Sequence, residues 1–235
     1  MLNNNLLALI ATLAVSLIWL RINDYLAHRG WISSHLSRKI IHIGTGPLFV
    51  LCWLLFTPTT ASRFLGALVP FSITIQFALV GLGVIEDQAS VDAMSRSGDR
   101  REILRGPLYY GIVFVILTIV FWLDTPIGIV ALMMLCGGDG LAEILGRRWG
   151  KKKIFKKGNK SWIGSIGFFL GGWSLAVCII GVFVAAGIFK MTFLNMLGTL
   201  AVIGIASTIV EAISPMDTDN ITVPLAAVIL GYLLF

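Results

Sequence analysis

Long apolar stretches separated by short polar segments make up most of the chain. They fall at Leu2–Leu20, Ile43–Phe56, Phe64–Ile85, Pro107–Leu123, Pro126–Leu141, Gly164–Phe189, Met191–Val210 and Ile221–Phe235. A helix needs about 20 apolar residues to cross the hydrocarbon core of a bilayer. The pattern therefore predicts an all-α, polytopic integral membrane protein with about eight transmembrane helices. The second, fifth and eighth stretches are short, which allows tilted, broken or partly re-entrant helices there.

The composition agrees with this pattern. Of the 235 residues, 57% are hydrophobic and only 13% are charged, against about 25% charged residues in an ordinary soluble domain. The mean hydropathy is +0.91. These values exclude a soluble globular protein, because the apolar runs are too numerous for one core and must be buried in lipid. Cys52, Cys136 and Cys178 lie in apolar runs without metal-ligand spacing, and we expect them to be buried small side chains.

The first stretch begins near Met1 and lacks a basic segment and a small-residue cleavage site. It is also too long for the apolar part of a signal peptide, so we expect it to be retained. No leader rich in Arg and Ser precedes it, and a bacterial origin is the simpler interpretation.

The basic residues are distributed unevenly between the polar segments. If eight spans alternate, segments 21–42, 86–106, 142–163 and 211–220 share one side and hold sixteen of the eighteen Lys and Arg residues; the other side holds only Arg63 and Lys190. The positive-inside rule makes the first side cytoplasmic and places both termini outside. All acidic residues except Asp124 also lie on that side or at its boundary. Polar groups kept at one interface favour an enzyme that uses a cytosolic reagent over a pore.

The densest candidate site lies at the end of the fifth stretch. Asp139 and Glu143 are four residues apart and would share a helix face, and Ala142, Gly146 and Gly150 would form a neighbouring stripe without bulk. A loop rich in Lys and Arg follows. Carboxylates, open backbone N–H groups and cations are what a magnesium–nucleotide site requires. The candidates are Gly138, Asp139, Gly140, Glu143, Gly146, Arg147, Gly150, Lys160, Ser161 and Gly164.

Simpler interpretations exist for parts of this stretch. Glycine stripes in membrane helices are often packing faces, and a basic loop can be a topology anchor that contacts anionic lipid. Asp139 is harder to explain in this way, since an ionisable group beside an apolar span is costly. The familiar nucleotide motifs of soluble proteins are absent from the sequence, so any nucleotide site is of a membrane-specific type.

Three further polar segments carry candidate residues, and each has a structural alternative. Arg38, Lys39 and His42 precede the second span, where His42 either binds phosphate or is a hydrogen-bonded structural residue. Arg101 and Arg105 lie before the helix start at Pro107, and their segment is otherwise a capped helix entrance. Glu211, Asp219 and Asn220 supply oxygen ligands suited to a divalent cation, although Ser-Pro and Asp-Asn also favour a plain turn.

Taken together, the motifs resemble a known enzyme family. The run Asp139-x-x-Ala142-x-x-x-Gly146-x-x-x-Gly150, followed by Asn159-Lys160-Ser161-x-x-Gly164, is similar to the CTP-binding loop of dolichol kinase and of the CTP-dependent polyprenol, phytol and diacylglycerol kinases. The motifs around Arg38-Lys39-x-x-His42, the run from Glu102 to Tyr110, and Asp219-Asn220-x-Thr222-Val223-Pro224 resemble the phytol kinase branch. Asn159, Ser161 and Ile163 stand where dolichol kinases carry Lys, Thr and Glu, which argues against that branch. The resemblance covers about residues 37–224.

The resemblance implies an integral-membrane kinase that transfers the terminal phosphate of CTP (or UTP) to a long-chain isoprenoid alcohol, phytol in particular. It implies a single domain over residues 1–235, with a peripheral segment 1–36 and a kinase-like core 37–224. Asp139, with Glu211 or Asp219, would hold Mg²⁺; Lys160, Arg147 and the Gly146 and Gly150 backbone would take the triphosphate; and a carboxylate, Asp139 first, would accept the hydroxyl proton. Expected nucleotide contacts also include Gly138, Gly140, Glu143, Ser161, Gly164, Arg38, Lys39, His42, Arg101, Arg105 and Asn220.

The expected partners are a nucleoside triphosphate, the alcohol and the lipid bilayer, and not nucleic acid; the oligomeric state is open. Two other functions remain. A phosphatidate cytidylyltransferase would use the same nucleotide and the same lipid phase but release pyrophosphate. A lipid or anion transporter would carry polar groups at mid-membrane depth and an internal repeat. Gln76 is the only strongly polar side chain deep in a predicted span, and no repeat is found.

Overall fold

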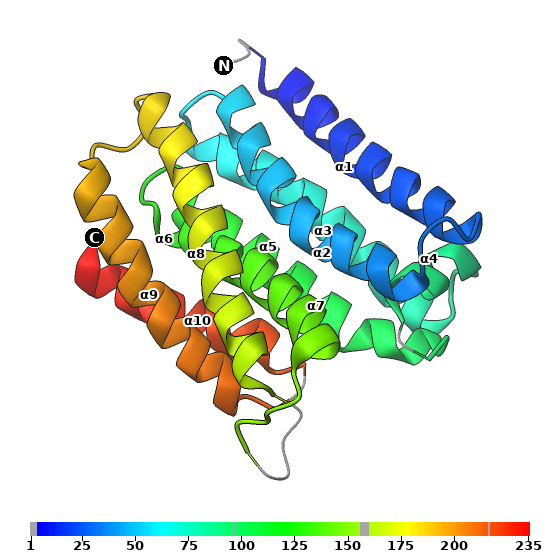
Figure 1. Cartoon of the computed structure of the whole chain (residues 1–235). Helices are drawn as coiled ribbons and strands as arrows, with labels where there is room; N and C mark the ends of the chain where they lie inside the picture. Colours follow the sequence, from blue (N-terminus) through cyan, green and yellow to red (C-terminus); the bar gives the residue numbers. More distant parts are fainter. Residues whose placement is uncertain (1–3, 96, 156–159, 216) are drawn as a thin grey trace. The chain divides into compact units, whose positions relative to one another are not determined.

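The computed structural model describes residues 4–95, 97–155, 160–215 and 217–235, and nearly all of them are helical or in short connections (Figure 1). Within these ranges there is no β-strand, only an isolated antiparallel bridge between Lys153 and Ser161. In the described part of the chain, seven helices are long and apolar enough to cross a membrane. The eighth apolar helix, α10 (Asp219–Leu234), has 16 residues and falls short of that length. The predicted all-α polytopic fold is confirmed, with the eighth stretch forming a short helix.

The chain divides into two compact units, Met1–Val120 and Phe121–Phe235. Our expectation of one domain with a peripheral segment 1–36 and a core 37–224 stays a prediction. The first unit contains α1 (Asn5–His28), α2 (Ser34–Cys52), η1 (Trp53–Leu55), α3 (Thr60–Leu82), α4 (Gln88–Met94), η2 (Arg100–Leu104) and α5 (Gly106–Phe121), whose last residue belongs to the second unit. The second unit contains α6 (Ile127–Met133), η3 (Met134–Gly138), α7 (Asp139–Trp149), α8 (Trp162–Ala185), α9 (Phe193–Ile213) and α10.

Side-chain caps explain where several helices of the first unit begin. The Asn4 side chain accepts a hydrogen bond from the backbone N–H of Leu6 at 2.8 Å, and α1 starts at the next residue, Asn5. The Asp87 carboxylate accepts from the N–H of Ser90 at 3.0 Å at the start of α4. Such caps satisfy backbone donors that have no partner within the helix. They fix helix ends in the short polar segments between the apolar stretches.

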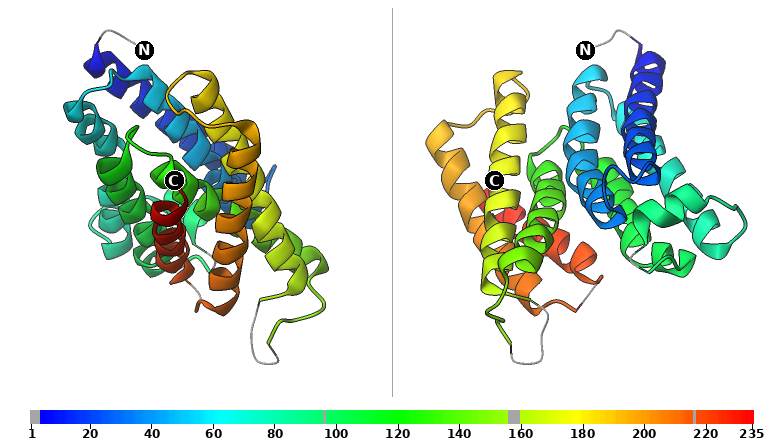
Figure 2. Two further views of the ribbon diagram at one scale, coloured as in Figure 1. Left: turned by 90° about the vertical axis from the view of Figure 1, so that its left-hand side faces the viewer. Right: turned by 45° about the vertical axis from the view of Figure 1, so that its right-hand side comes forward.

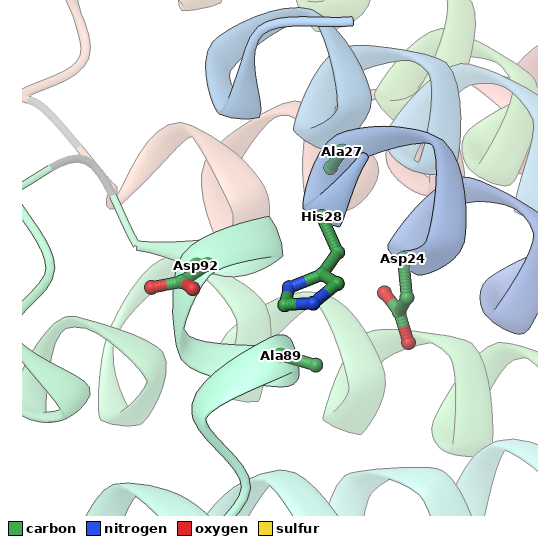
Figure 3. A pocket seen from close by; sticks show the side chains of 5 residues that line it. All are labelled: Asp24, Ala27, His28, Ala89 and Asp92. Atoms are coloured by element: carbon green, nitrogen blue, oxygen red, sulfur yellow. The ribbon is translucent and has the colours of Figure 1, made fainter. Parts of the chain in front are cut away.

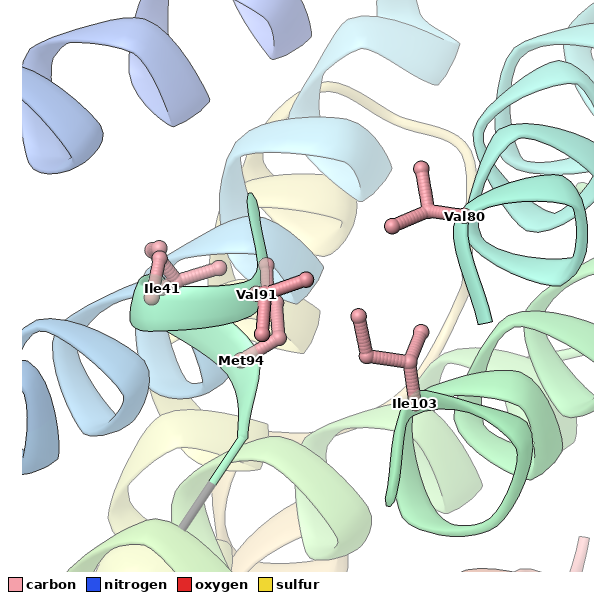
Figure 4. Close-up of a cluster of buried hydrophobic side chains, with 6 residues drawn as sticks. Ile41, Val80, Val91, Met94 and Ile103 are labelled. Carbon is pink, nitrogen blue, oxygen red and sulfur yellow. The ribbon is translucent and has the colours of Figure 1, made fainter. Parts of the chain in front are cut away.

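A cluster of apolar side chains holds α2, α3, α4 and η2 together (Figure 4). Ile41, Val80, Val91, Met94 and Ile103 are all buried, with exposed fractions of 9% or less. They come from four elements that are distant in sequence, so the short helix α4 and the turn η2 are anchored to the longer helices by burial of apolar surface.

The continuous helical stretch Ile127–Trp149, formed by α6, η3 and α7, is the most buried span of the chain. Every residue of α6 and of η3 is buried, because α8 and α10 pack against this stretch within the second unit. η3 is a π-helical turn at Met134–Gly138. The helix of the fifth predicted span is thus continuous through the π-turn, and it extends past Leu141 to Trp149.

Glycines allow this central stretch to approach α8 closely. A β-carbon at Gly171 would meet the side chain of Leu141 at 2.8 Å and the Gly137 carbonyl carbon at 2.9 Å. A β-carbon at Gly167 would lie 2.9 Å from the Leu145 side chain. Small residues of this kind let helix backbones pack together in membranes. The glycines of η3 and α8 therefore have a packing role.

The prediction for the cysteines is partly wrong. Cys52 and Cys136 are buried, but Cys178 is exposed on the surface of α8. In a membrane helix an apolar residue can face lipid as readily as the protein interior. An apolar run alone therefore does not decide burial.

Candidate active site

Lys160 joins three separate segments of the second unit. Its ammonium group donates a hydrogen bond to Asp219 Oδ2 at 2.9 Å and also pairs with Glu211 Oε1. Lys160 precedes α8, Glu211 lies in the last turn of α9, and Asp219 is the first residue of α10. The ion pairs bring the basic loop before α8 together with the turn between α9 and α10, which are about 50 to 60 residues apart in sequence.

All three charged groups of this cluster are largely removed from solvent. The side chain of Glu211 is 3% exposed, that of Asp219 12% and that of Lys160 26%. Burial alone would lower the pKa of Lys160, but the adjacent carboxylates of Asp219 and Glu211 outweigh this effect and raise the pKa above its ordinary value. Lys160 is therefore a cation at neutral pH.

Asp139 contributes a third carboxylate. It is half-buried at the start of α7, directly after the π-turn η3, and it interacts electrostatically with both Glu211 and Asp219. A π-turn changes the direction in which the following side chains point, and such turns occur often at functional sites. The structure thus gathers Asp139, Lys160, Glu211 and Asp219, which the sequence analysis had drawn from separate motifs.

The carboxylate oxygens of this cluster are of the ligand type that hard divalent cations prefer. Within the described ranges, no three His, Cys, Asp or Glu side chains are close enough to form a ready-made metal cage. Mg²⁺ does not require such a cage, because it is usually held by one or two carboxylates together with substrate phosphates and water. Carboxylates drawn from Asp139, Glu211 and Asp219 fit that pattern, and their role in binding Mg²⁺ stays a prediction.

Ser161 follows Lys160 and starts α8. Its hydroxyl oxygen accepts a hydrogen bond from the N–H of Gly164 at 3.1 Å, and the residue is buried. A β-carbon at Gly146 would lie 3.3 Å from this oxygen, and one at Gly164 would lie 3.1 Å from it. A β-carbon at Gly150 would lie still closer to the same oxygen. The glycines of the motif therefore make room for the Ser161 cap, which is their packing role; a contact of Gly146 and Gly150 with phosphate stays a prediction.

The basic loop is closed by backbone hydrogen bonds at its base. Ile154 N–H donates to the Lys160 carbonyl at 3.0 Å and Trp162 N–H donates to the Lys152 carbonyl at 3.2 Å. Arg147 is 65% exposed and its guanidinium lies 3.7 Å from Glu143. Asn159 of the sequence motif lies outside the described residues. Lys160 is consequently held at the rim of the loop, close to the buried carboxylates.

The predicted site residues of the first unit differ from one another in burial and in contacts. Lys39 is 2% exposed, although we had expected it to contact nucleotide. The His42 ring packs against the Tyr110 ring with centroids 4.5 Å apart, and the Tyr110 hydroxyl donates to the His42 carbonyl at 2.9 Å. Arg101 and Arg105 are exposed. Nucleotide contacts of these residues and of Arg38 stay predictions, as do those of Gly138, Gly140 and Asn220 in the second unit.

A small cavity of about 130 Å³ lies between α1 and α4 of the first unit (Figure 3). It is lined by Asp24, Ala27, His28, Ala89 and Asp92. Asp92 accepts a hydrogen bond from Gln88 at 2.8 Å, and Asp24 lies 3.8 Å from the Arg21 guanidinium. None of its lining residues belongs to the predicted site.

Comparison with known proteins adds a decisive observation. The chain is 44% identical over 229 residues to a protein of Oryza sativa subsp. japonica named probable phytol kinase 1, chloroplastic, a match that covers 97% of this chain and 72% of the rice protein. The chain belongs to the phytol kinase family. It is also 36% identical over 214 residues to phytol kinase 1 of Arabidopsis thaliana, covering 90% of this chain and 70% of that protein.

The family includes an enzyme named for a second alcohol. Farnesol kinase of Arabidopsis thaliana is 40% identical over 210 residues, covering 88% of this chain and 68% of the relative. No protein-family model matches the chain, and no solved structure matches it. The resemblance to phytol kinases inferred from the motifs is confirmed.

Proposed function

We propose that the protein is a membrane-embedded phytol kinase that transfers the terminal phosphoryl group of CTP (or UTP) to the primary hydroxyl group of phytol. Two observations support this proposal. The matches to relatives named phytol kinase extend over most of the chain, and in the second unit Lys160 pairs with the buried carboxylates of Glu211 and Asp219, with the half-buried Asp139 interacting electrostatically with both. The cluster of Lys160 with Glu211 and Asp219 is the observation that carries the site assignment.

The proposed reaction forms one bond and breaks one. The hydroxyl oxygen of the alcohol bonds to the terminal phosphorus, and the bond from that phosphorus to the bridging oxygen of the nucleotide breaks. The hydroxyl proton moves to a carboxylate, with Asp139 as first candidate, and the products are the alkyl monophosphate and the nucleoside diphosphate. Because such transfers proceed through a loose transition state, positioning and charge neutralisation supply most of the catalysis.

Lys160 is suited to neutralise charge on the transferring group. Its ammonium is held at the cluster by Asp219 and Glu211 and stays charged at neutral pH. A cation in a site with little water is worth far more than one in bulk solvent, because the local dielectric constant is low. Mg²⁺, when bound by carboxylates of the cluster, would neutralise further phosphate charge.

The membrane explains the choice of substrate and the position of the site. A long isoprenoid tail stays in the hydrocarbon region, and only the hydroxyl group has to reach the polar boundary where Lys160 lies. Since the loop before α8 is rich in lysine and arginine, we propose that the nucleotide binds from the cytoplasmic side and that both termini lie outside. The relatives' names state that those proteins are chloroplastic.

The test is the fate of labelled nucleotide. Purified protein is incubated with CTP labelled at the terminal phosphate and, in separate reactions, with phytol, geranylgeraniol, farnesol, dolichol, diacylglycerol or phosphatidate. We expect label in phytyl phosphate and release of CDP. Release of pyrophosphate with phosphatidate as substrate would instead identify a cytidylyltransferase, and no transfer to any alcohol would contradict the proposal.

A further inference from the structure

Among the described residues of the second unit, two serines have a buried hydroxyl group without a hydrogen-bond partner. They are Ser207 on α9, which is 0% exposed, and Ser165 on α8, whose hydroxyl oxygen is shielded from solvent. A buried hydroxyl without a partner destabilises the fold, because it has lost its hydrogen bonds to water and gained none from the protein. Other hydroxyl groups on the same two helices do have partners. Thr208 Oγ1 donates to the Gly204 carbonyl at 2.7 Å, and Ser174 Oγ donates to the Leu170 carbonyl at 2.6 Å.

Contacts between α8 and α9 fix the level at which these two serines lie. The helices are antiparallel neighbours (Figure 2). At the end of the helices where α8 begins, Lys160 pairs with Glu211. About two turns farther along α8, the Phe169 ring lies against Gly204. One turn beyond that, Trp173 donates to the Leu197 carbonyl at 3.3 Å. Ser165 and Ser207 therefore fall at the same level, between the first contact and the second.

This level is adjacent to the charged cluster on its membrane side. Ser207 is four residues before Glu211 and both are buried, so they share one face of α9, separated by about one helical turn or 5.4 Å. The carboxylate cluster is thus at the polar boundary, and Ser207 is one turn closer to the hydrocarbon region. A substrate with an apolar tail and a terminal hydroxyl would present its hydroxyl between these two levels.

We propose that Ser207, with Ser165 beside it, binds the hydroxyl group of the isoprenoid alcohol and positions its oxygen toward the cluster of Lys160, Glu211 and Asp219. This inference rests on the proposed function and adds the residues that hold the acceptor. A serine hydroxyl can donate to the alcohol oxygen and accept from its proton, which orients the alcohol without removing the proton. The alcohol thereby supplies the hydrogen bonds that both serines lack.

The experiment compares Ser207→Ala with Thr208→Val, which removes a hydroxyl group that is already bonded within α9. For full-length protein in detergent, we expect Ser207→Ala to raise KM for phytol by about fivefold to tenfold, to leave KM for CTP unchanged, and to keep or raise Tm. Thr208→Val should leave both KM values near those of the wild type. Ser207→Cys, which keeps the size with a weaker donor, should shift KM for phytol in the same direction, so the test does not depend on one variant.

An unchanged KM for phytol in Ser207→Ala would overturn the inference. If the wild-type protein still phosphorylates phytol in the same assay, the proposed function is unaffected by that result. A lower Tm with activity that follows the folded fraction would also overturn it, since Ser207 would then bind an internal water for structural reasons. Failure of the wild-type protein to phosphorylate any alcohol would contradict the proposed function instead.

Discussion

The ammonium group of Lys160 donates to the carboxylate of Asp219 at 2.9 Å, across 59 residues of sequence. Together with the Glu211 pair, this contact connects the basic loop before α8 to the start of α10. A charge held in this way supports the fold and, in the proposed reaction, neutralises phosphate. Substitutions of Lys160 must therefore separate stability from catalysis.

We predict that Lys160→Met lowers alcohol kinase activity per folded molecule by on the order of a hundredfold. Lys151→Gln is the matched control, because Lys151 is an exposed cation of the same loop, and its activity should stay within about twofold of the wild type, as for other surface changes. The measurement is initial rate divided by the folded fraction from circular dichroism. Similar losses in both variants would contradict a specific role for Lys160.

Lys160→Met should also lower stability, since it leaves Glu211 and Asp219 buried without their cation. The loss should be less than the about 3–5 kcal/mol of a fully buried pair, because the Lys160 side chain is 26% exposed. Adding Glu211→Gln to Lys160→Met should recover part of the Tm and none of the activity. Recovery of activity in the double variant would show that neither charge is used in the reaction.

The glycine packing face gives a prediction that is independent of function. Gly171→Ala places a β-carbon against the Gly137 backbone and 2.8 Å from the Leu141 side chain, so it should destabilise the protein by about 1–3 kcal/mol. Gly181→Ala in the same helix meets nothing within 4 Å and should leave Tm unchanged or slightly raised. Thermal unfolding of both variants checks this. Equal Tm values for the two would contradict close contact between α8 and η3.

Topology can be measured with single cysteines in a background that lacks Cys52, Cys136 and Cys178. We predict that a cysteine at Lys152 reacts with a membrane-impermeant reagent from the cytoplasmic side. Cysteines at Thr59 and Lys190 should react only from the opposite side, because nearly all cations lie in the loops of the Lys152 side. All three wild-type side chains are exposed. Labelling of Thr59 from the same side as Lys152 would break the alternating arrangement.

Much of the fold could be predicted from the sequence because lipid imposes a simple rule. Apolar runs of sufficient length must form helices in a bilayer, and the predicted spans correspond to the observed helices. The sequence did not distinguish lipid-facing from buried positions within a run, as Cys178 shows. It also did not reveal the π-turn at Met134–Gly138, whose Gly137 and Gly138 lie close against α8.

The sequence identified the residues of the candidate site but not the contacts between them. Asp139, Lys160, Glu211 and Asp219 were singled out separately, but an ion pair across 51 or more residues leaves no local pattern in one sequence. Ser207 was missed, because a single serine in an apolar run resembles many packing residues. The signal available was its position four residues before Glu211.

In the proposed alcohol kinase reaction, Asp139 acts together with Lys160, Glu211 and Asp219. The most direct measurement is transfer of labelled terminal phosphate from CTP to phytol, per folded molecule, across a Mg²⁺ titration for the wild type and for Asp139→Asn. We predict rapid, Mg²⁺-dependent transfer by the wild type and a loss of about three orders of magnitude in a variant that inserts and purifies normally. A well-folded Asp139→Asn variant with wild-type turnover and wild-type Mg²⁺ dependence would contradict the account.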